Sequence, residues 1–274
     1  MLAFLFSLFC ALAEPQLARH SLQSHAVNKK MGYTVLLPQG YQQTTSYPLI
    51  LFLHGLGDTD KNISRSSVAR TLGHLMDADE LSKCVVVFPN GEVGYWSNSL
   101  DGKRNYADYV FEVLKDVQSH YRISSVPSQR VIAGLSMGGF GALSIGLQNP
   151  QTFGIIAVLS PTDMELAVRD KPSFRVYQSV FGTPPTAGYV AALNPRELIL
   201  RGAGEGQDII MVYGAAEQKK FSVGAERLIR VAKAQGIEIK TRVVADGKHD
   251  FKTTWNAKSM RWIFISVEQS LRSK

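Results

Sequence analysis

The strongest constraint on the fold is a series of short apolar runs that alternates along the chain with amphipathic segments. Uninterrupted apolar runs of this kind indicate strands that are buried on both faces of a sheet. The runs cover residues 33–37, 49–53, 85–88, 131–133, 155–159, 209–212 and 237–244, and segments with helical spacing cover residues 68–81, 106–120, 140–148 and 221–235. The alternation predicts one α/β domain with a mostly parallel central sheet and helices on both faces.

One stretch, residues 161–201, breaks this rhythm because it is rich in proline and aromatic residues. We expect a helical excursion over the sheet here, rather than a second domain. In an open α/β sheet the ligand crevice lies outside the carboxyl ends of the strands, so an insertion after a strand can shape a pocket. The alternative is that the aromatic side chains only pack the excursion onto the sheet.

The amino-terminal residues 1–13 are apolar and uncharged but too few to span a bilayer. Ala11 and Ala13 provide the small-x-small pattern of a cleavage site before Glu14. We therefore predict a signal peptide over residues 1–13, a mature domain over residues 14–274, a secreted or periplasmic protein, and no stable membrane insertion after cleavage. The alternatives are a buried amino-terminal helix or a misplaced start, since this stretch lacks Lys and Arg.

Composition excludes several other classes of protein. The chain is 45% hydrophobic and 19% charged, which is typical of globular domains. Its net charge of +7 comes from scattered Lys and Arg, so no nucleic-acid groove is predicted. After cleavage Cys84 would be the single cysteine and could form no internal disulfide. No His, Cys or carboxylate pair has metal-ligand spacing, so we predict no metal or cofactor, and the sequence leaves the oligomeric state unknown.

A serine between two glycines joins the apolar run at 131–133 to the helical segment at 140–148. In this G-x-S-x-G turn Gly134 and Gly138 flank Ser136, and the tight backbone lifts the hydroxyl to the carboxyl edge of the sheet. The following helix begins with Met137, and its positive end favours a developing oxyanion. We predict that Ser136 is a nucleophile and that the Met137 N–H is an oxyanion donor.

A serine hydroxyl needs a base, and in chains with this turn an acid and then a histidine follow the serine. His249 is the only one of six histidines downstream of Ser136, and it follows the last predicted strand. Glu217 follows the preceding strand, where the acid is expected. Asp246 and Asp250 stay open as alternatives because they are close to His249 in sequence.

The second oxyanion donor is expected in the loop after an early strand, where the sequence reads Leu53-His54-Gly55-Leu56-Gly57. The N–H of Leu56 is the predicted donor. His54 is expected to hold this loop rather than to act as a second base.

The sequence resembles a known group at three motifs, residues 53–57, 134–143 and 247–251, the last followed by Trp255. The group is the Putative esterase branch of the α/β hydrolases, which includes esterase D, tributyrin and feruloyl esterases, and the mycolyltransferases. The resemblance implies the α/β-hydrolase fold and agrees with the roles of Ser136 and His249. Most esterases of the branch have Asp where this chain has Glu217, whereas the mycolyltransferases use Glu.

We therefore expect a secreted serine carboxylic-ester hydrolase that acts through a Ser-His-Glu triad and an acyl-enzyme. Its expected substrate is a small-molecule or polysaccharide-linked ester. An acyltransferase would use the same residues and differ in whether an acceptor alcohol or water takes the acyl group. A non-catalytic binding protein on the same scaffold is the alternative from another class, although it would need neither the serine nor the histidine.

Overall fold

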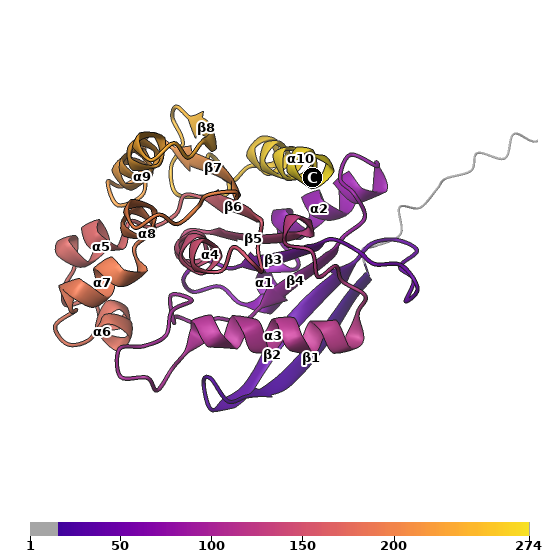
Figure 1. Cartoon of the computed structure of the whole chain (residues 1–274), viewed down its shortest axis with the longest axis horizontal. Helices are drawn as coiled ribbons and strands as arrows, with labels where there is room; N and C mark the ends of the chain where they lie inside the picture. Colours follow the sequence, from indigo (N-terminus) through magenta and orange to yellow (C-terminus); the bar gives the residue numbers. More distant parts are fainter. Residues whose placement is uncertain (1–15, 274) are drawn as a thin grey trace, which may run out of the picture.

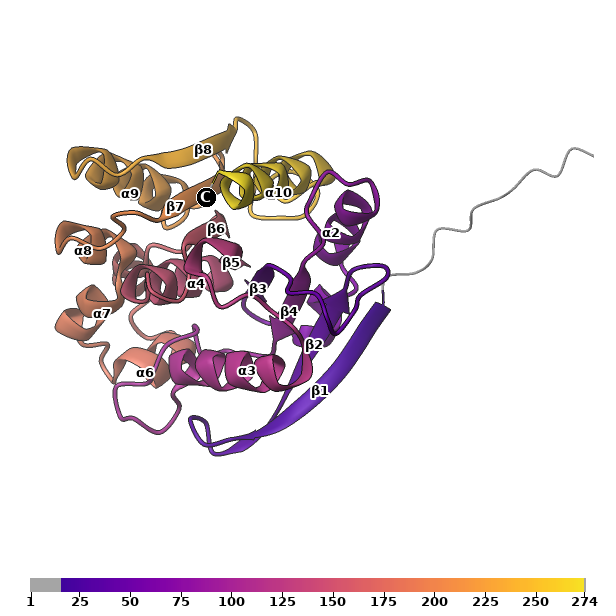
Figure 2. The same ribbon diagram turned by 45° about the vertical axis from the view of Figure 1, so that its right-hand side comes forward.

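The computed structural model describes residues 16–273, so the predicted signal peptide lies outside the described residues. An eight-stranded sheet runs through the molecule in the order β1-β2-β4-β3-β5-β6-β7-β8. The strands are β1 Gln16–Ser24, β2 Lys29–Leu37, β3 Leu49–Leu53, β4 Val85–Pro89, β5 Arg130–Leu135, β6 Ile155–Leu159, β7 Asp208–Gly214 and β8 Ile239–Val244. β1 and β2 pair antiparallel, β2 also pairs antiparallel with β4, and the other pairs are parallel. Figure 2 shows the β1–β2 ribbon at one end of the sheet and β8 at the other.

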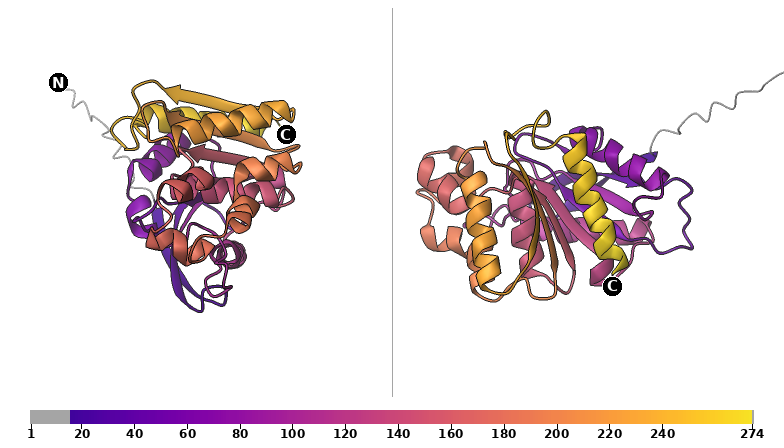
Figure 3. Two further views of the ribbon diagram at one scale, coloured as in Figure 1. Left: turned by 90° about the vertical axis from the view of Figure 1, so that its left-hand side faces the viewer. Right: turned by 90° about the horizontal axis from the view of Figure 1, so that it is seen from above.

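Helices cover both faces of this sheet. The α-helices are α1 Asp60–Ile63, α2 Ser67–Asp77, α3 Tyr106–His120, α4 Met137–Gln148, α5 Met164–Asp170, α6 Arg175–Phe181, α7 Ala187–Leu193, α8 Pro195–Leu200, α9 Ser222–Ala234 and α10 Ala257–Arg272, and a 3₁₀ turn spans Pro127–Gln129. One buried cluster joins the sheet to α3–α9, and a second joins its other face to α1, α2 and α10. The two helical layers are visible on either side of the strands (Figures 1 and 3).

The central strands belong to both clusters because side chains alternate between the faces of a strand. In β3, Leu51 and Leu53 lie in the first cluster, whereas Ile50 and Phe52 lie in the second. Every residue of β3, β4 and β6 is buried. The apolar runs of β3, β4 and β6 therefore mark strands covered on both faces, and the predicted α/β architecture is confirmed. The same expectation is wrong for residues 237–244, because β8 is an edge strand that carries charged residues and is mostly half-buried or exposed.

Besides the 3₁₀ turn, three elements fall where the sequence analysis assigned none: α1, β1 and α10. β1 is an edge strand whose residues are mostly exposed or half-buried, so it lacks the apolar run that marks the inner strands. α10 buries one face against the second cluster and presents polar residues on the other. Within residues 161–201 the chain forms the four short helices α5–α8, which lie between β6 and β7 in the chain. No helix within residues 16–273 is long and apolar enough to cross a membrane.

Candidate active site

Ser136 lies at the turn between β5 and α4, at the carboxyl edge of the parallel strands. Its backbone has φ 57° and ψ −115°, a conformation that costs energy for a residue with a side chain and is typical of functional turns. The Ser136 N–H donates to the Leu159 carbonyl oxygen at 2.8 Å. A Cβ added at Gly138 would lie against the Leu53 carbonyl oxygen. The turn therefore has no room for a side chain at position 138, as the sequence predicts.

The imidazole of His249 reaches this serine from the loop that follows β8. His249 Nε2 lies 2.8 Å from Ser136 Oγ, across 113 residues of sequence. Two aromatic rings hold the imidazole. Phe221 stacks on it with centroids 3.6 Å apart and planes 16° apart, and Trp255 meets it edge-on at 4.5 Å and 74°. The hydroxyl and the base are thus within hydrogen-bonding distance.

Glu217 lies on the other side of the imidazole, in the loop after β7. Its Oε1 atom is 3.5 Å from His249 Nδ1, and its side chain is fully buried, whereas the His249 side chain is 24% exposed. Neither His249 Nδ1 nor Glu217 Oε2 has a hydrogen-bond partner among the described residues. A distance of 3.5 Å exceeds that of a good hydrogen bond, and such contacts are often long before substrate binds.

The two aspartates that the sequence left open as alternatives lie elsewhere. Asp246 is exposed. Asp250 accepts hydrogen bonds from the N–H and the hydroxyl of Thr253, both at 2.8 Å. These bonds lower the pKa of Asp250 below its ordinary value. Asp250 therefore closes the turn after His249, and Glu217 is the carboxylate that the fold brings to Nδ1.

The loop predicted to carry the second oxyanion donor lies beside Ser136. A Cβ added at Gly55 would be 3.6 Å from the Cβ of Ser136. Leu56 follows in the same turn, which the Asp58 N–H closes by donating to the Gly55 carbonyl oxygen at 3.2 Å. Met137 is the first residue of α4, so its N–H is among the four that have no acceptor within the helix. Both candidate amides are thus close to Ser136 in the fold.

His54 holds this loop, as the sequence analysis expected. It is fully buried, and the Gly91 N–H donates to its Nε2 at 2.9 Å. Nδ1 therefore carries the proton and donates to the Gly55 carbonyl oxygen at 2.8 Å. Burial lowers the pKa of His54, which keeps the ring neutral. With both ring nitrogens occupied, His54 has a structural role.

Ser160 and Phe221 were not singled out from the sequence, and Trp255 was named there only as part of a motif, without a role at the site. Ser160 donates to Glu217 Oε1 at 2.6 Å, and Phe221 and Trp255 contact the His249 ring. Ser160 does carry a sequence signal, because it directly follows the apolar run at 155–159 and so lies at the carboxyl end of a buried strand. Phe221 carries none, since an aromatic residue at the start of a helix is common in any core.

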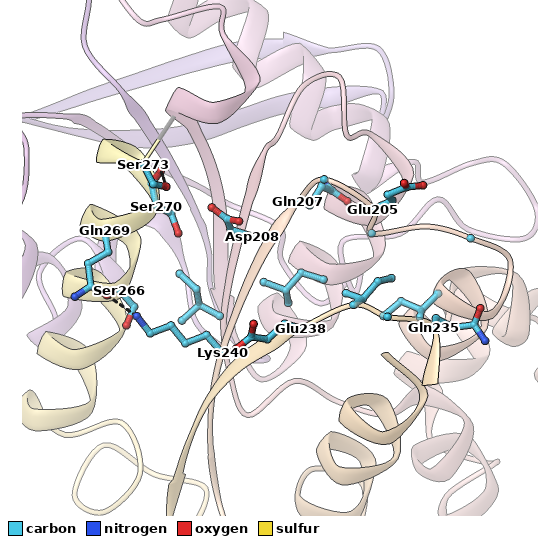
Figure 4. A pocket seen from close by; sticks show the side chains of 18 residues that line it. Glu205, Gln207, Asp208, Gln235, Glu238, Lys240, Ser266, Gln269, Ser270 and Ser273 are labelled. Atoms are coloured by element: carbon cyan, nitrogen blue, oxygen red, sulfur yellow. Dashed lines mark hydrogen bonds between the residues drawn. The ribbon is translucent and has the colours of Figure 1, made fainter. Parts of the chain in front are cut away.

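A large hollow of about 740 Å³ lies at the opposite edge of the sheet, where β7 and β8 begin. Figure 4 shows the side chains that line it, and the labelled ones, which include Glu205, Asp208, Glu238 and Lys240, are polar. None of the predicted site residues lines it. Ligands of open α/β sheets bind at the carboxyl ends of the strands, so this hollow is not the site of the serine chemistry. Within residues 16–273 no group of three His, Cys, Asp or Glu side chains could hold a metal ion.

A mostly parallel sheet with helices on both faces and a serine at a strand-to-helix turn, within reach of a histidine, defines a protein of the α/β-hydrolase fold. Residues 24–262 match the profile of the family described as "Putative esterase". The chain belongs to this family.

Individual relatives agree with this assignment. Esterase Rv1288 of Mycobacterium tuberculosis is 32% identical over 138 residues, which cover 47% of this chain and 29% of that protein. The chain thus matches less than a third of the length of this relative. The acetyl esterase of Caldicellulosiruptor saccharolyticus is 28% identical over 195 residues, which cover 65% of this chain and 71% of that protein.

Solved structures share the fold across almost the whole chain. A ferulic acid esterase superposes with a TM-score of 0.76 at 20% identity, covering 94% of this chain and 99% of the other. A fluorophosphonate-binding serine hydrolase of Staphylococcus aureus has a TM-score of 0.75 at 18% identity, covering 91% and 98%. At these identities the likeness establishes the fold.

Proposed function

We propose that the protein is a secreted serine carboxylic-ester hydrolase that works through an acyl-enzyme on Ser136. The observation that carries the proposal is the 2.8 Å contact between His249 Nε2 and the Ser136 hydroxyl at a strained strand-to-helix turn. A structural role would need neither the strain nor a histidine from a distant loop.

In the first half of the reaction, Ser136 Oγ attacks the ester carbonyl carbon while His249 Nε2 accepts its proton. The carbonyl oxygen becomes negative and accepts hydrogen bonds from the N–H groups of Leu56 and Met137. His249 then returns the proton to the departing alcohol. Glu217 stabilises the imidazolium that exists between these two transfers.

In the second half, water replaces the alcohol. His249 Nε2 takes a proton from this water while the water oxygen attacks the acyl carbon. The bond between the acyl carbon and Ser136 Oγ then breaks, and His249 returns the proton to Ser136 Oγ, which releases the carboxylic acid and restores the free serine. An alcohol in place of water would give acyl transfer with the same residues. The balance between the two outcomes depends on which acceptor fills the space beside His249, whose side chain is 24% exposed.

The substrate class we propose is acetyl or feruloyl esters, including those linked to polysaccharides. Support comes from relatives whose names state these activities, an acetyl esterase and a ferulic acid esterase. A feruloyl esterase name also occurs for a relative from Aspergillus niger, 27% identical over 139 residues, which cover 50% of this chain and 48% of that protein.

A direct test combines covalent labelling with turnover. A fluorophosphonate probe should add to Ser136, and mass spectrometry of the digested protein should place the adduct there. Nitrophenyl esters of increasing chain length, methyl ferulate and acetylated xylan should then rank the acyl groups, and a sugar alcohol added to the assay measures transfer. Folded protein that takes no label on Ser136 and hydrolyses none of these esters would contradict the proposal and favour a binding protein.

Export is a separate part of the proposal. It rests on the apolar, uncharged residues 1–13 and the Ala11-Leu12-Ala13 pattern. Expression of the full chain in a secreting host should release protein whose first residue is Glu14. Protein that stays inside the cell and retains Met1 would contradict export while leaving the ester hydrolysis unaffected.

A further inference from the structure

The carboxylate of Glu217 has one hydrogen-bond donor among the residues that the structure describes, and this donor is not His249. Ser160 Oγ lies 2.6 Å from Glu217 Oε1. His249 Nδ1 lies farther away, 3.5 Å from the same oxygen. Within residues 16–273 Glu217 Oε2 has no hydrogen-bond partner, and the side chain is fully buried. A buried carboxylate is not hydrated, so it is stabilised by the protein groups that donate hydrogen bonds to it. The Ser160 hydroxyl therefore has a large effect on the position of the Glu217 carboxylate.

The direction of the hydrogen bonds around Ser160 follows from the chemistry of its neighbours. Trp255 Nε1 lies 2.9 Å from Ser160 Oγ, and an indole N–H can only donate. The Ser160 oxygen therefore accepts from Trp255, and its own proton is directed to the Glu217 carboxylate. The result is two hydrogen bonds in series: Trp255 donates to Ser160, and Ser160 donates to Glu217.

The backbone at Ser160 is also specialised for this position. Ser160 directly follows β6, is fully buried, and has a φ of 47°, which residues with a side chain rarely adopt. Its N–H donates to the Val212 carbonyl oxygen at 2.7 Å, which fixes it beside the strand that leads to Glu217. Strained, fully hydrogen-bonded residues of this kind concentrate at functional sites.

We propose that Ser160 is a positioning residue that holds the Glu217 carboxylate in register with His249, and that Trp255 acts through it. This inference rests on the proposed function. The Trp255 ring also meets the His249 imidazole edge-on at 4.5 Å. One tryptophan thus contacts the base directly and the acid through the Ser160 hydroxyl.

The test is a double-mutant cycle on Ser160→Ala and Trp255→Phe, with steady-state kinetics on a nitrophenyl ester. Loss of a hydrogen bond to a charged group should lower kcat by about 10- to 100-fold in Ser160→Ala, with KM within about twofold of wild type. Trp255→Phe keeps a ring beside His249 but removes the N–H, so it should lower kcat less. Combined with Ser160→Ala it should have little further effect, because its N–H has lost its acceptor.

Two controls separate positioning from folding. Ser266→Ala removes the hydroxyl of another buried serine, on α10 and beside the distant hollow, and should leave kcat unchanged. Should Ser160→Ala fail to fold, Ser160→Gly replaces it, since glycine adopts a positive φ readily and also lacks the hydroxyl. Wild-type kcat in a folded Ser160 variant, or fully additive effects of the two substitutions, would overturn the inference. An inactive wild-type enzyme would instead overturn the proposed function.

Discussion

The Phe221 ring stacks on the His249 imidazole with centroids 3.6 Å apart and planes 16° apart. Phe221 lies between β7 and α9, whereas His249 lies in the loop after β8. The contact therefore joins the two loops that follow the last two strands of the sheet. The phenylalanine is 5% exposed. Such a close, nearly parallel contact restricts the rotation of the imidazole and keeps Nε2 directed to Ser136.

Removing this ring should therefore impair turnover more than binding. We expect Phe221→Ala to lower kcat by about tenfold, the kinetic equivalent of one aromatic contact, since the imidazole gains freedom to leave its reactive orientation. Phe221→Tyr preserves the stacked ring and should stay within about twofold of wild type. Steady-state kinetics on one nitrophenyl ester measures both variants. Equal kcat values for Phe221→Ala and wild type would contradict a positioning role for the ring.

Glu217→Gln should be far more damaging than the loss of either neighbouring aspartate. The amide cannot stabilise the imidazolium and favours the wrong tautomer of His249, so we expect kcat to fall by about 10⁴-fold. Asp246→Asn should keep near-normal turnover because Asp246 is exposed. Asp250→Asn should lower thermal stability rather than kcat, because Asp250 caps the turn at Thr253. Near-normal turnover in Glu217→Gln would transfer the acid role to one of these aspartates.

Ser136→Ala supplies the reference for these kinetic effects. Without the hydroxyl no acyl-enzyme forms, so kcat should fall by about 10⁶-fold if the three groups act as a unit. The variant should keep the melting temperature of the wild type, since alanine retains the Cβ, and the Ser136 side chain is half-buried and not part of the apolar core. Ester hydrolysis at an unchanged rate, measured on protein free of host esterases, would exclude Ser136 as the nucleophile.

The sequence predicted Ser136 and His249 as a nucleophile and its base because the chemistry requires one residue type at a fixed place in the strand order, and the fold brings these two side chains together. The glycines on both sides of Ser136 are best explained by a tight turn, and His249 is the only histidine that follows Ser136 in the sequence. The inner strands could also be predicted from the sequence, since burial on both faces requires an unbroken apolar run. β1 could not, because an edge strand half exposed to water needs no such run.

The residues around Ser136 and His249 were harder to predict for a different reason. The role of Ser160 depends on a 2.6 Å contact with a residue 57 positions away, and no local pattern encodes this distance. Glu217 was distinguished from Asp246 and Asp250 only by its place after a strand, and the decisive fact, which carboxylate faces Nδ1, is a property of loop geometry. Long-range side-chain contacts of this kind become visible only in the folded molecule.

Substitution of Gly138 by alanine should disrupt the turn that carries the nucleophile. The added Cβ would collide with the carbonyl oxygen of Leu53, a backbone atom that cannot rotate away. We expect a loss of stability of about 3 kcal/mol or more and no measurable turnover. Gly188→Ala is the matched control, because nothing lies within 4 Å of a Cβ at this position in α7. It should stabilise the protein by about 0.5–1 kcal/mol, measured by urea unfolding.

His20 links the edge strand β1 to the end of α3 in a cluster of rings far from the active site. Its Nε2 lies 2.7 Å from the Tyr121 hydroxyl, and its ring stacks on Tyr33 at 5.1 Å and lies 4.9 Å from the ring of His120. Burial and the charge of His120 lower the pKa of His20 below its ordinary value of 6.5, and Asp116 opposes this shift. The folded protein therefore favours the neutral form of His20.

This cluster should make the protein less stable in mild acid. As the pH falls through 6.5, His20 of the unfolded chain binds a proton, whereas folded His20 does so only at lower pH. The unfolded state then binds more protons, so the free energy of unfolding decreases in this window and levels off below the folded pKa. The buried His54, whose pKa is also lowered, adds to the same decrease. In His20→Gln the decrease should be smaller, and urea unfolding at several pH values between about 8 and 5 measures it. An identical pH dependence in the variant and the wild type would show that His20 does not link protonation to folding.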